Sequence, residues 1–228
     1  TNNPTTEEGV ALGRMLFYDP VLSQDGTVSC SSCHHQKFAF SDAGNPFSLG
    51  IRSQTGNRNA PSIQNVLWQT TFMWDGGINH LEIMPFGPIT NPVEMGENLP
   101  FVLSKLNHSK YRAAFRQVFQ KDSIDSQQVF YALTQFLGNL ITANSRYDQY
   151  KRGLVTFSQE EQAGYQIFQN RCNSCHTEPL FTNFSFQNNG LDSVFGDYGR
   201  YRITLEAGDA GKFKVPTLRN ISFTTPYM

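Results

Sequence analysis

The clearest pattern in the chain is an apolar stripe with the spacing of an α-helix. Side chains three or four residues apart lie on one helix face, so the stripe predicts a core helix over about residues 126–150. Residues 98–119 are also helical in pattern, with a break expected near Asn107-His108-Ser109. Strand patterns are weak, and we therefore expect an all-α, loop-rich fold. The stripe consists of Val129, Leu133, Phe136, Leu137, Leu140 and Ile141.

A second pattern occurs twice along the chain. Thr5-Thr-Glu-Glu8 and Ser158-Gln-Glu-Glu161 each have the sequence of a capping box, which begins a helix. Each is followed by Gly-x-x-x-Phe, at Gly13 to Phe17 and at Gly164 to Phe168. The four-residue step places both side chains on one helix face, where the glycine allows a neighbouring helix or a bound group to approach closely. The duplication predicts two units, which we place at residues 1–152 and 153–228.

Composition and charge argue against two classes of protein, those that bind nucleic acid and those that span a membrane. The 228 residues carry 18 basic and 19 acidic side chains, a net charge of −1, so no nucleic-acid partner is expected. The longest apolar runs are too short for a bilayer, which predicts no membrane span. Residues 41–62 and 181–202 are rich in Gly, Asn, Ser and Pro. A chain with so many loops needs an additional apolar partner to organise its core.

The cysteines indicate what that partner is. All four fall in two Cys-x-x-Cys-His motifs, Cys30-Ser-Ser-Cys33-His34 and Cys172-Asn-Ser-Cys175-His176. Two cysteines three residues apart can form thioethers with the two vinyl groups of one haem, and the adjacent histidine then reaches the iron. The motifs therefore predict two covalently attached haems c, with His34 and His176 as iron ligands.

Three other uses of paired cysteines compete with haem attachment. A zinc ribbon does not require a histidine after both pairs. A redox dithiol usually occurs once, near a βαβ pattern, and structural disulfides do not explain the histidines. Haem attachment accounts for every cysteine and both histidines. Because covalent haem is assembled outside the reducing cytoplasm, we expect a periplasmic location.

Further motifs lie before, between and after the haem sites. They are Leu16-Phe-Tyr-Asp19-Pro20, Arg58-Asn59-Ala60-Pro61, Met73-Trp74-Asp75-Gly76, Asn91-Pro-Val-Glu94-Met95-Gly96, Phe213-Lys-Val-Pro216-Thr-Leu-Arg219-Asn220 and Thr224-Thr-Pro226-Tyr227. Together with the two haem motifs they resemble a known family, the bacterial di-haem cytochrome c peroxidases and the related MauG enzymes. The resemblance implies two cytochrome c-like domains, each around one haem. It makes the haem at His34 the peroxide site and the haem at His176 the site that receives electrons.

The resemblance also assigns roles to single residues. Trp74 matches the tryptophan between the haems, and Glu94 matches the carboxylate beside the peroxide. Asn59, Thr224 and Pro226 match the residues that hold a calcium ion, for which hard oxygen ligands are suitable. A small cytochrome c or cupredoxin is the electron donor that the family implies. Relatives form dimers, so a homodimer is also among the expected partners.

The chain departs from the family pattern at three places. Ile51 stands where many members have a distal histidine that leaves the iron on reduction, so the first haem is expected to be open already, as in MauG. Met84 stands where the family often has a glutamine. The chain ends at Met228, before the segment that brings the sixth ligand of the second haem, so the C-terminal domain is expected to be truncated.

Met84 has three interpretations. A thioether is a poor hydrogen-bond partner for peroxide, and it can also bind haem iron and block catalysis. The simpler interpretation is that Met84 fills apolar space. Glu94 and Trp74 likewise have plain alternatives, a solvated loop carboxylate and an ordinary core residue. The family match favours catalysis by Glu94 and electron transfer through Trp74.

The sequence therefore predicts a di-haem peroxidase that reduces hydrogen peroxide to water, with Glu94 as the general acid–base group. Two alternatives stay open. A MauG-like enzyme would oxidise residues of a protein substrate, and Ile51 fits it equally well. A non-enzymatic electron carrier would have the first haem capped by Met84 and would not react with peroxide.

Overall fold

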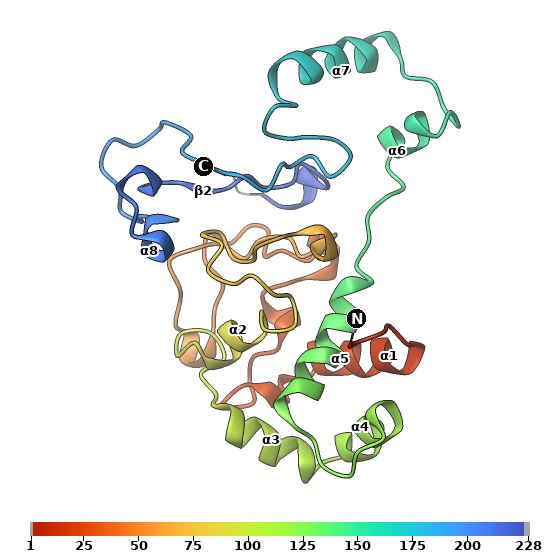
Figure 1. Cartoon of the computed structure of the whole chain (residues 1–228), viewed down its shortest axis with the longest axis vertical. Coiled ribbons are helices and arrows are strands. Elements are labelled where there is room, and N and C mark those ends of the chain that lie inside the picture. Colours follow the sequence, from red (N-terminus) through yellow and green to blue (C-terminus); the bar gives the residue numbers. More distant parts are fainter. Residues whose placement is uncertain (1, 226–228) are drawn as a thin grey trace. The chain divides into compact units, whose positions relative to one another are not determined.

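The computed structural model describes residues 2–225, and in them the chain is helix-rich with two short strands (Figure 1). The chain divides into two compact units. The first takes in the residues up to Trp68, then Ile78–Leu140, and a short segment from Ser222. The second consists of Gln69–Gly77 and Ile141–Ile221. The expected boundary after residue 152 stays a prediction for the haem-loaded protein.

The first unit is organised around a helix pair, α1 (Glu7–Tyr18) and α5 (Ser126–Gly138) (Figure 1). A Cβ on Gly13 would overlap the carbonyl oxygen of Ala132 in α5, so the two backbones touch there. Phe17 packs against Phe136 with ring centroids 5.0 Å apart. The close approach predicted for Gly13 is confirmed. The unit's other helices are α2 (Phe86–Thr90), α3 (Leu99–Asn107) and α4 (Tyr111–Phe119).

Two predicted helix boundaries need correction. The helix expected over 126–150 ends at Gly138, and the chain restarts as α6 (Arg146–Lys151) because Ser145 and Asp148 form a capping box. At the N-terminus, the cap of α1 is Thr6, whose side chain accepts from the Gly9 amide. The Thr6 amide donates to the Gln135 side chain of α5, which replaces the local capping-box partner. The break expected near 107–109 is confirmed between α3 and α4.

The second unit contains α6, α7 (Gln159–Arg171) and α8 (Tyr201–Thr204). Its two strands, β1 (Phe186–Gln187) and β2 (Phe213–Lys214), are antiparallel, with Phe186 opposite Lys214. The predicted capping box at Ser158 and Glu161 begins α7. Apart from its chain neighbours and the adjoining backbone of α7, no described residue lies within 4 Å of a Cβ placed on Gly164, so the close approach expected there does not occur among the described residues.

Candidate functional site

The first Cys-x-x-Cys-His motif folds as a short 3-10 turn, Cys30–Ser32, that aims His34. Ser29 and Ser32 cap the turn reciprocally, and the His34 amide donates to the Cys30 carbonyl over 3.0 Å. The His34 Nδ1 atom lies 2.9 Å from the Phe40 carbonyl oxygen. Since a carbonyl only accepts, Nδ1 carries the proton and Nε2 keeps its lone pair. This is the tautomer that an iron ligand needs.

Burial sets the protonation of the first motif. It raises the pKa of the Cys30 thiol to about 12 and also raises the pKa of Cys33. It lowers the pKa of His34, so the imidazole is neutral at neutral pH. The described residues also contain no group of three or more His, Cys, Asp and Glu side chains placed to hold a metal ion.

The second motif follows α7 and has the same design. The His176 amide donates to the Cys172 carbonyl over 2.9 Å. The His176 Nδ1 atom lies 3.2 Å from the Phe181 carbonyl oxygen and 3.1 Å from that of Pro216. Both carbonyls require a proton on Nδ1, so Nε2 is again the nitrogen with the lone pair. Two thiols three residues apart and one oriented imidazole are present at both motifs, and this donor set fits a haem.

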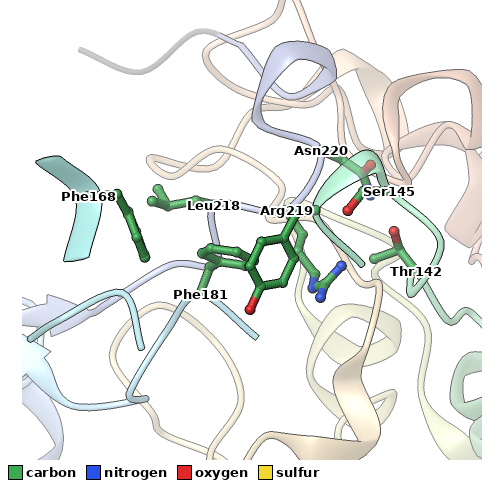
Figure 2. A pocket seen from close by; sticks show the side chains of 8 residues that line it. Thr142, Ser145, Phe168, Phe181, Leu218, Arg219 and Asn220 are labelled. Carbon is green, nitrogen blue, oxygen red and sulfur yellow. The ribbon is translucent and has the colours of Figure 1, made fainter. Parts of the chain in front are cut away.

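A pocket of about 250 Å³ opens in the second unit beside this motif (Figure 2). Figure 2 shows Phe168 and Phe181 facing into it, with Leu218 beside them. The ring centroids of Phe168 and Phe181 are 5.3 Å apart. Phe181 also supplies one of the two carbonyls bonded to His176. The pocket is therefore mainly aromatic and aliphatic on the side nearest the motif, as a flat apolar group would require.

Arg219 lines the same pocket but has its own partners. Its guanidinium binds Asp148 through two bonds of 2.9 and 2.7 Å, and it donates to the Pro179 carbonyl over 2.9 and 2.6 Å. The arginine beside Asp148 holds the pKa of that carboxyl well below its usual range. The pair is buried, with side-chain exposures of 7% and 12%. A structural role explains Arg219 better than pairing with a haem propionate.

Glu94 lies in the first unit, on a tight turn that fixes its carboxylate. The Asn91 side-chain amide donates to the Glu94 carboxylate over 2.7 Å, and the Glu94 amide donates to the Asn91 carbonyl over 3.0 Å. Burial raises the pKa of Glu94, and the bond from Asn91 opposes that rise. A half-buried carboxylate with a dedicated donor differs from the solvated loop residue that was the alternative. Sequence reasoning did not single out Asn91, although it lies in the same motif.

Ile51 is fully buried at 1% exposure beside this turn. Its amide donates to the Glu94 carbonyl over 2.8 Å, and its side chain lies against Gly96, where a Cβ would overlap it. Gly96 has a positive φ of 61°, which glycine adopts readily. Met84 lies half-buried at the turn before α2, in the same unit. Its amide donates to the Leu81 carbonyl. The three interpretations of Met84 all stay open.

Trp74 belongs to the second unit, together with His176. It is half-buried, and its carbonyl accepts from the Lys214 amide over 2.8 Å. The guanidinium of Arg200 donates to the carbonyls of Asp75 and Gly76 over 2.9 and 3.0 Å. The sequence analysis singled out neither Lys214 nor Arg200, because no local pattern shows that residues so far along the chain contact the segment from Trp74 to Gly76.

The expected calcium ligands are only partly described. Asn59 and Thr224 are half-buried residues of the first unit, and Pro226 lies outside the described residues. The Gly44 amide donates to the Thr225 carbonyl over 2.9 Å, which ties this segment to the unit. The calcium site stays a prediction.

Within the described part of the chain, no helix combines the length and apolar character that crossing a membrane requires.

Comparison with known proteins identifies a family to which the chain is similar. The sequence pattern of the family described as di-haem cytochrome c peroxidase matches residues 7–156. The chain is 35% identical to cytochrome c551 peroxidase of Nitrosomonas europaea, covering 98% of this chain and 69% of that protein. It is 34% identical to methylamine utilization protein MauG of Methylorubrum extorquens, covering 99% of this chain and 65% of that protein. The chain thus spans about two thirds of the length of these relatives.

The fold has a solved counterpart. A crystal structure described as a MauG-like protein associated with microbial copper homeostasis superposes with a TM-score of 0.89. It is 32% identical in sequence, and the match covers 100% of this chain and 73% of that one. A helix-rich arrangement with few strands is therefore shared with that protein.

Proposed function

Because the chain belongs to the di-haem cytochrome c peroxidase family, as its motifs predicted, we propose that it reduces hydrogen peroxide to water with electrons from a small redox protein. Family membership confirms the predicted enzyme class, an oxidoreductase of the peroxidase type. It also implies two haems. The observation that carries the proposal is the tautomer of both motif histidines, each of which donates Nδ1–H to backbone carbonyls.

The two motifs would each hold one haem. Cys30 and Cys33 would form the thioethers of the first haem and His34 its iron bond, with Cys172, Cys175 and His176 in the same roles for the second. When bound, the haems supply the electron chemistry of peroxide reduction. The protein fixes Nε2 of each histidine through the carbonyls that hold Nδ1. Such a bond also makes the imidazole a stronger ligand.

Glu94 would handle the proton. Peroxide reduction consumes two electrons and two protons and releases two waters. Glu94 takes the proton from one peroxide oxygen and returns it to the other, so that water can leave and the carboxylate is regenerated. Asn91 holds the carboxylate in one orientation over 2.7 Å. The electrons come from two molecules of a one-electron donor, a small cytochrome c or cupredoxin, and Trp74 would lie on their route from the haem at His176.

The presence of Ile51 favours a peroxide site, at the haem proposed for His34, that needs no reductive activation. An isoleucine offers no atom that binds iron, and its amide and side chain are both engaged, with Glu94 and with Gly96. A loop held in this way keeps the Glu94 turn in a single arrangement. We therefore expect peroxide to react with the fully oxidised protein.

A MauG-like activity is the second candidate, in which the oxidised enzyme removes electrons from a residue of a protein substrate. The similarity to MauG and to the MauG-like crystal structure favours it. The third candidate, a carrier with Met84 on the first iron, requires both haems to be inert to peroxide. We place the protein in the periplasm. We also expect a calcium ion bound by Asn59, Thr224 and Pro226, and we expect the protein to form a homodimer.

One experiment separates the three candidates. The ferric full-length protein is examined by optical and EPR spectroscopy before and after one equivalent of hydrogen peroxide. A high-spin signal that peroxide removes, followed by rapid oxidation of a reduced cytochrome c, supports the peroxidase. A long-lived oxidised state with slow turnover of cytochrome supports the MauG-like enzyme. Two low-spin haems that ignore peroxide would contradict both and leave the carrier.

A further inference from the structure

Lys214 contacts the Trp74 segment through both its main chain and its side chain. Its backbone amide donates to the Trp74 carbonyl over 2.8 Å. Its ammonium group donates to the Gln69 side chain over 2.6 Å and to the Thr71 carbonyl over 2.7 Å. One residue thus holds the segment at three points, although Lys214 follows it by about 140 positions. All these residues belong to the second unit.

The same stretch of chain also holds the candidate iron ligand of this unit. Two residues after Lys214, the Pro216 carbonyl accepts from His176 Nδ1 over 3.1 Å. The backbone between these contacts is fixed, because Lys214 is paired with Phe186 in the β1–β2 sheet and the Val215 amide donates to the Ser185 carbonyl. Trp74 and His176 are therefore bonded to positions two residues apart on one rigid segment.

The charge of Lys214 is poorly hydrated. Burial lowers the pKa of Lys214 to about 8, while the nearby carboxylate of Asp75 opposes the shift. Asp75 itself is buried at 8% exposure and accepts from the Gly77 amide. A further charge near this segment is that of Arg200, which lies over the Phe186 ring at 4.4 Å and donates to the carbonyls of Asp75 and Gly76. An ammonium in such surroundings acts on its neighbours with little screening by water.

We propose that Lys214 positions Trp74 relative to His176 and that its positive charge raises the reduction potential of the haem bound at His176. This inference rests on the proposed assignment of a haem to His176. It adds a residue outside the Cys-x-x-Cys-His motif, Lys214, that would tune the delivery of electrons. A nearby positive charge disfavours ferric iron relative to ferrous iron, so its presence favours reduction. Ordinary loop anchoring would give Lys214 a structural role without this effect.

The test is a spectroelectrochemical titration of the haem at His176 in the di-haem protein, at pH values on either side of 8. In the wild type the potential should fall as the pH rises through about 8, since Lys214 then loses its charge. Lys214→Met should have the lower potential already at neutral pH and should lose this pH dependence. Lys214→Arg should restore the high potential and keep it through the alkaline range.

Lys212→Met is the matched control, because Lys212 lies two residues away and its ammonium group pairs with Asp209 over 3.2 Å. It should titrate like the wild type. Gln69→Leu provides a second test, because this variant keeps Lys214 but removes one acceptor of its ammonium group. Loss of an acceptor disfavours the ammonium form, so the inflection should move to lower pH. Equal potentials and equal pH dependence in Lys214→Met and Lys212→Met would overturn the inference. Because no peroxide is used, a failed peroxidase assay would not affect this result.

Discussion

The backbone amide of Ile51 donates a hydrogen bond of 2.8 Å to the backbone carbonyl of Glu94. The residue at the position of the family's removable distal ligand is thus bonded to the residue proposed to handle the proton. The Ile51 side chain is 1% exposed and lies against Gly96. This relationship favours a loop that stays in place on reduction and oxidation.

The first prediction concerns Ile51→His. Because the site is apolar and closely packed, the imidazole should destabilise the fold by about 1–3 kcal/mol through desolvation, and it should not become an iron ligand. Chemical denaturation measures the stability, and EPR of the ferric protein reports the spin state. Ile51→Val is the matched control, expected to cost about 0.5–1.5 kcal/mol. Conversion of the first haem to a six-coordinate low-spin form in Ile51→His would contradict the prediction.

The second prediction concerns the pH dependence of peroxide turnover. Glu94 must be ionised to take a proton, so kcat/KM should decline as the pH falls through its pKa. Burial raises that pKa above the usual 4.5, and the Asn91 bond opposes the rise. Asn91→Leu should therefore move the acidic limb to higher pH, because the charged form loses its donor.

Glu94→Gln tests the same pH dependence of kcat/KM by removing the carboxylate altogether. It should lower kcat/KM by about 10²–10⁴-fold and abolish the acidic limb, since the amide cannot exchange the proton. Thr90→Val, near the same turn, removes a hydroxyl that donates to the Phe86 and Gly87 carbonyls, and it should leave the acidic limb in place. An unchanged limb in Asn91→Leu would show that the amide does not tune Glu94.

The parts of this fold that the sequence predicted are those set by local contacts. The break before Tyr111 and the cap at Ser158 follow from residues close together in the chain. The close approach at Gly13 was predicted from the glycine itself, but its partner Ala132 lies far along the chain and was not identified. The end of α5 at Gly138 was missed because the apolar stripe continues to Ile141, which proves 54% exposed. The contacts of Lys214 with Gln69 and Thr71 join residues about 140 positions apart, and no local pattern encodes them.

The third prediction concerns the buried pair of Asp148 and Arg219. Arg219→Met leaves the Asp148 carboxylate without its principal partner, so unfolding should require about 3–5 kcal/mol less free energy. The depressed pKa of Asp148 means that the pair stabilises the fold above the carboxyl's unfolded-state pKa and that this stability is lost as the pH falls toward the lower folded-state pKa. The difference in stability between wild type and variant should therefore shrink in acid.

An exposed ion pair provides the control for this comparison. Lys121 and Asp125 are four residues apart and 3.1 Å from each other at the surface. Lys121→Met should cost only about 0.3–0.5 kcal/mol at neutral pH. Denaturant titrations of both variants at neutral and acidic pH provide the measurement. A loss in Arg219→Met no larger than in Lys121→Met would mean that the buried pair adds no stability beyond that of a solvated one.

The fourth prediction compares the two glycines of the repeated Gly-x-x-x-Phe pattern. A methyl group on Gly13 would overlap the Ala132 carbonyl, so Gly13→Ala should separate α1 from α5 and cost about 1–3 kcal/mol. At Gly164 no described residue outside the adjoining backbone of α7 lies within 4 Å of the added carbon. Alanine is also the better helix former, so Gly164→Ala should stabilise α7 by up to about 1 kcal/mol.

The expected changes in stability have opposite signs in Gly13→Ala and Gly164→Ala. Measuring both tests whether the glycine of the Gly-x-x-x-Phe pattern has the same role in both units. Thermal and denaturant unfolding of the same full-length preparation gives both values, and circular dichroism checks that the helix content is retained. Opposite effects would show that the glycine serves close helix packing only in the first unit. A loss of stability at both positions would mean instead that α7 has a close neighbour in the intact protein, as the duplicated pattern originally predicted.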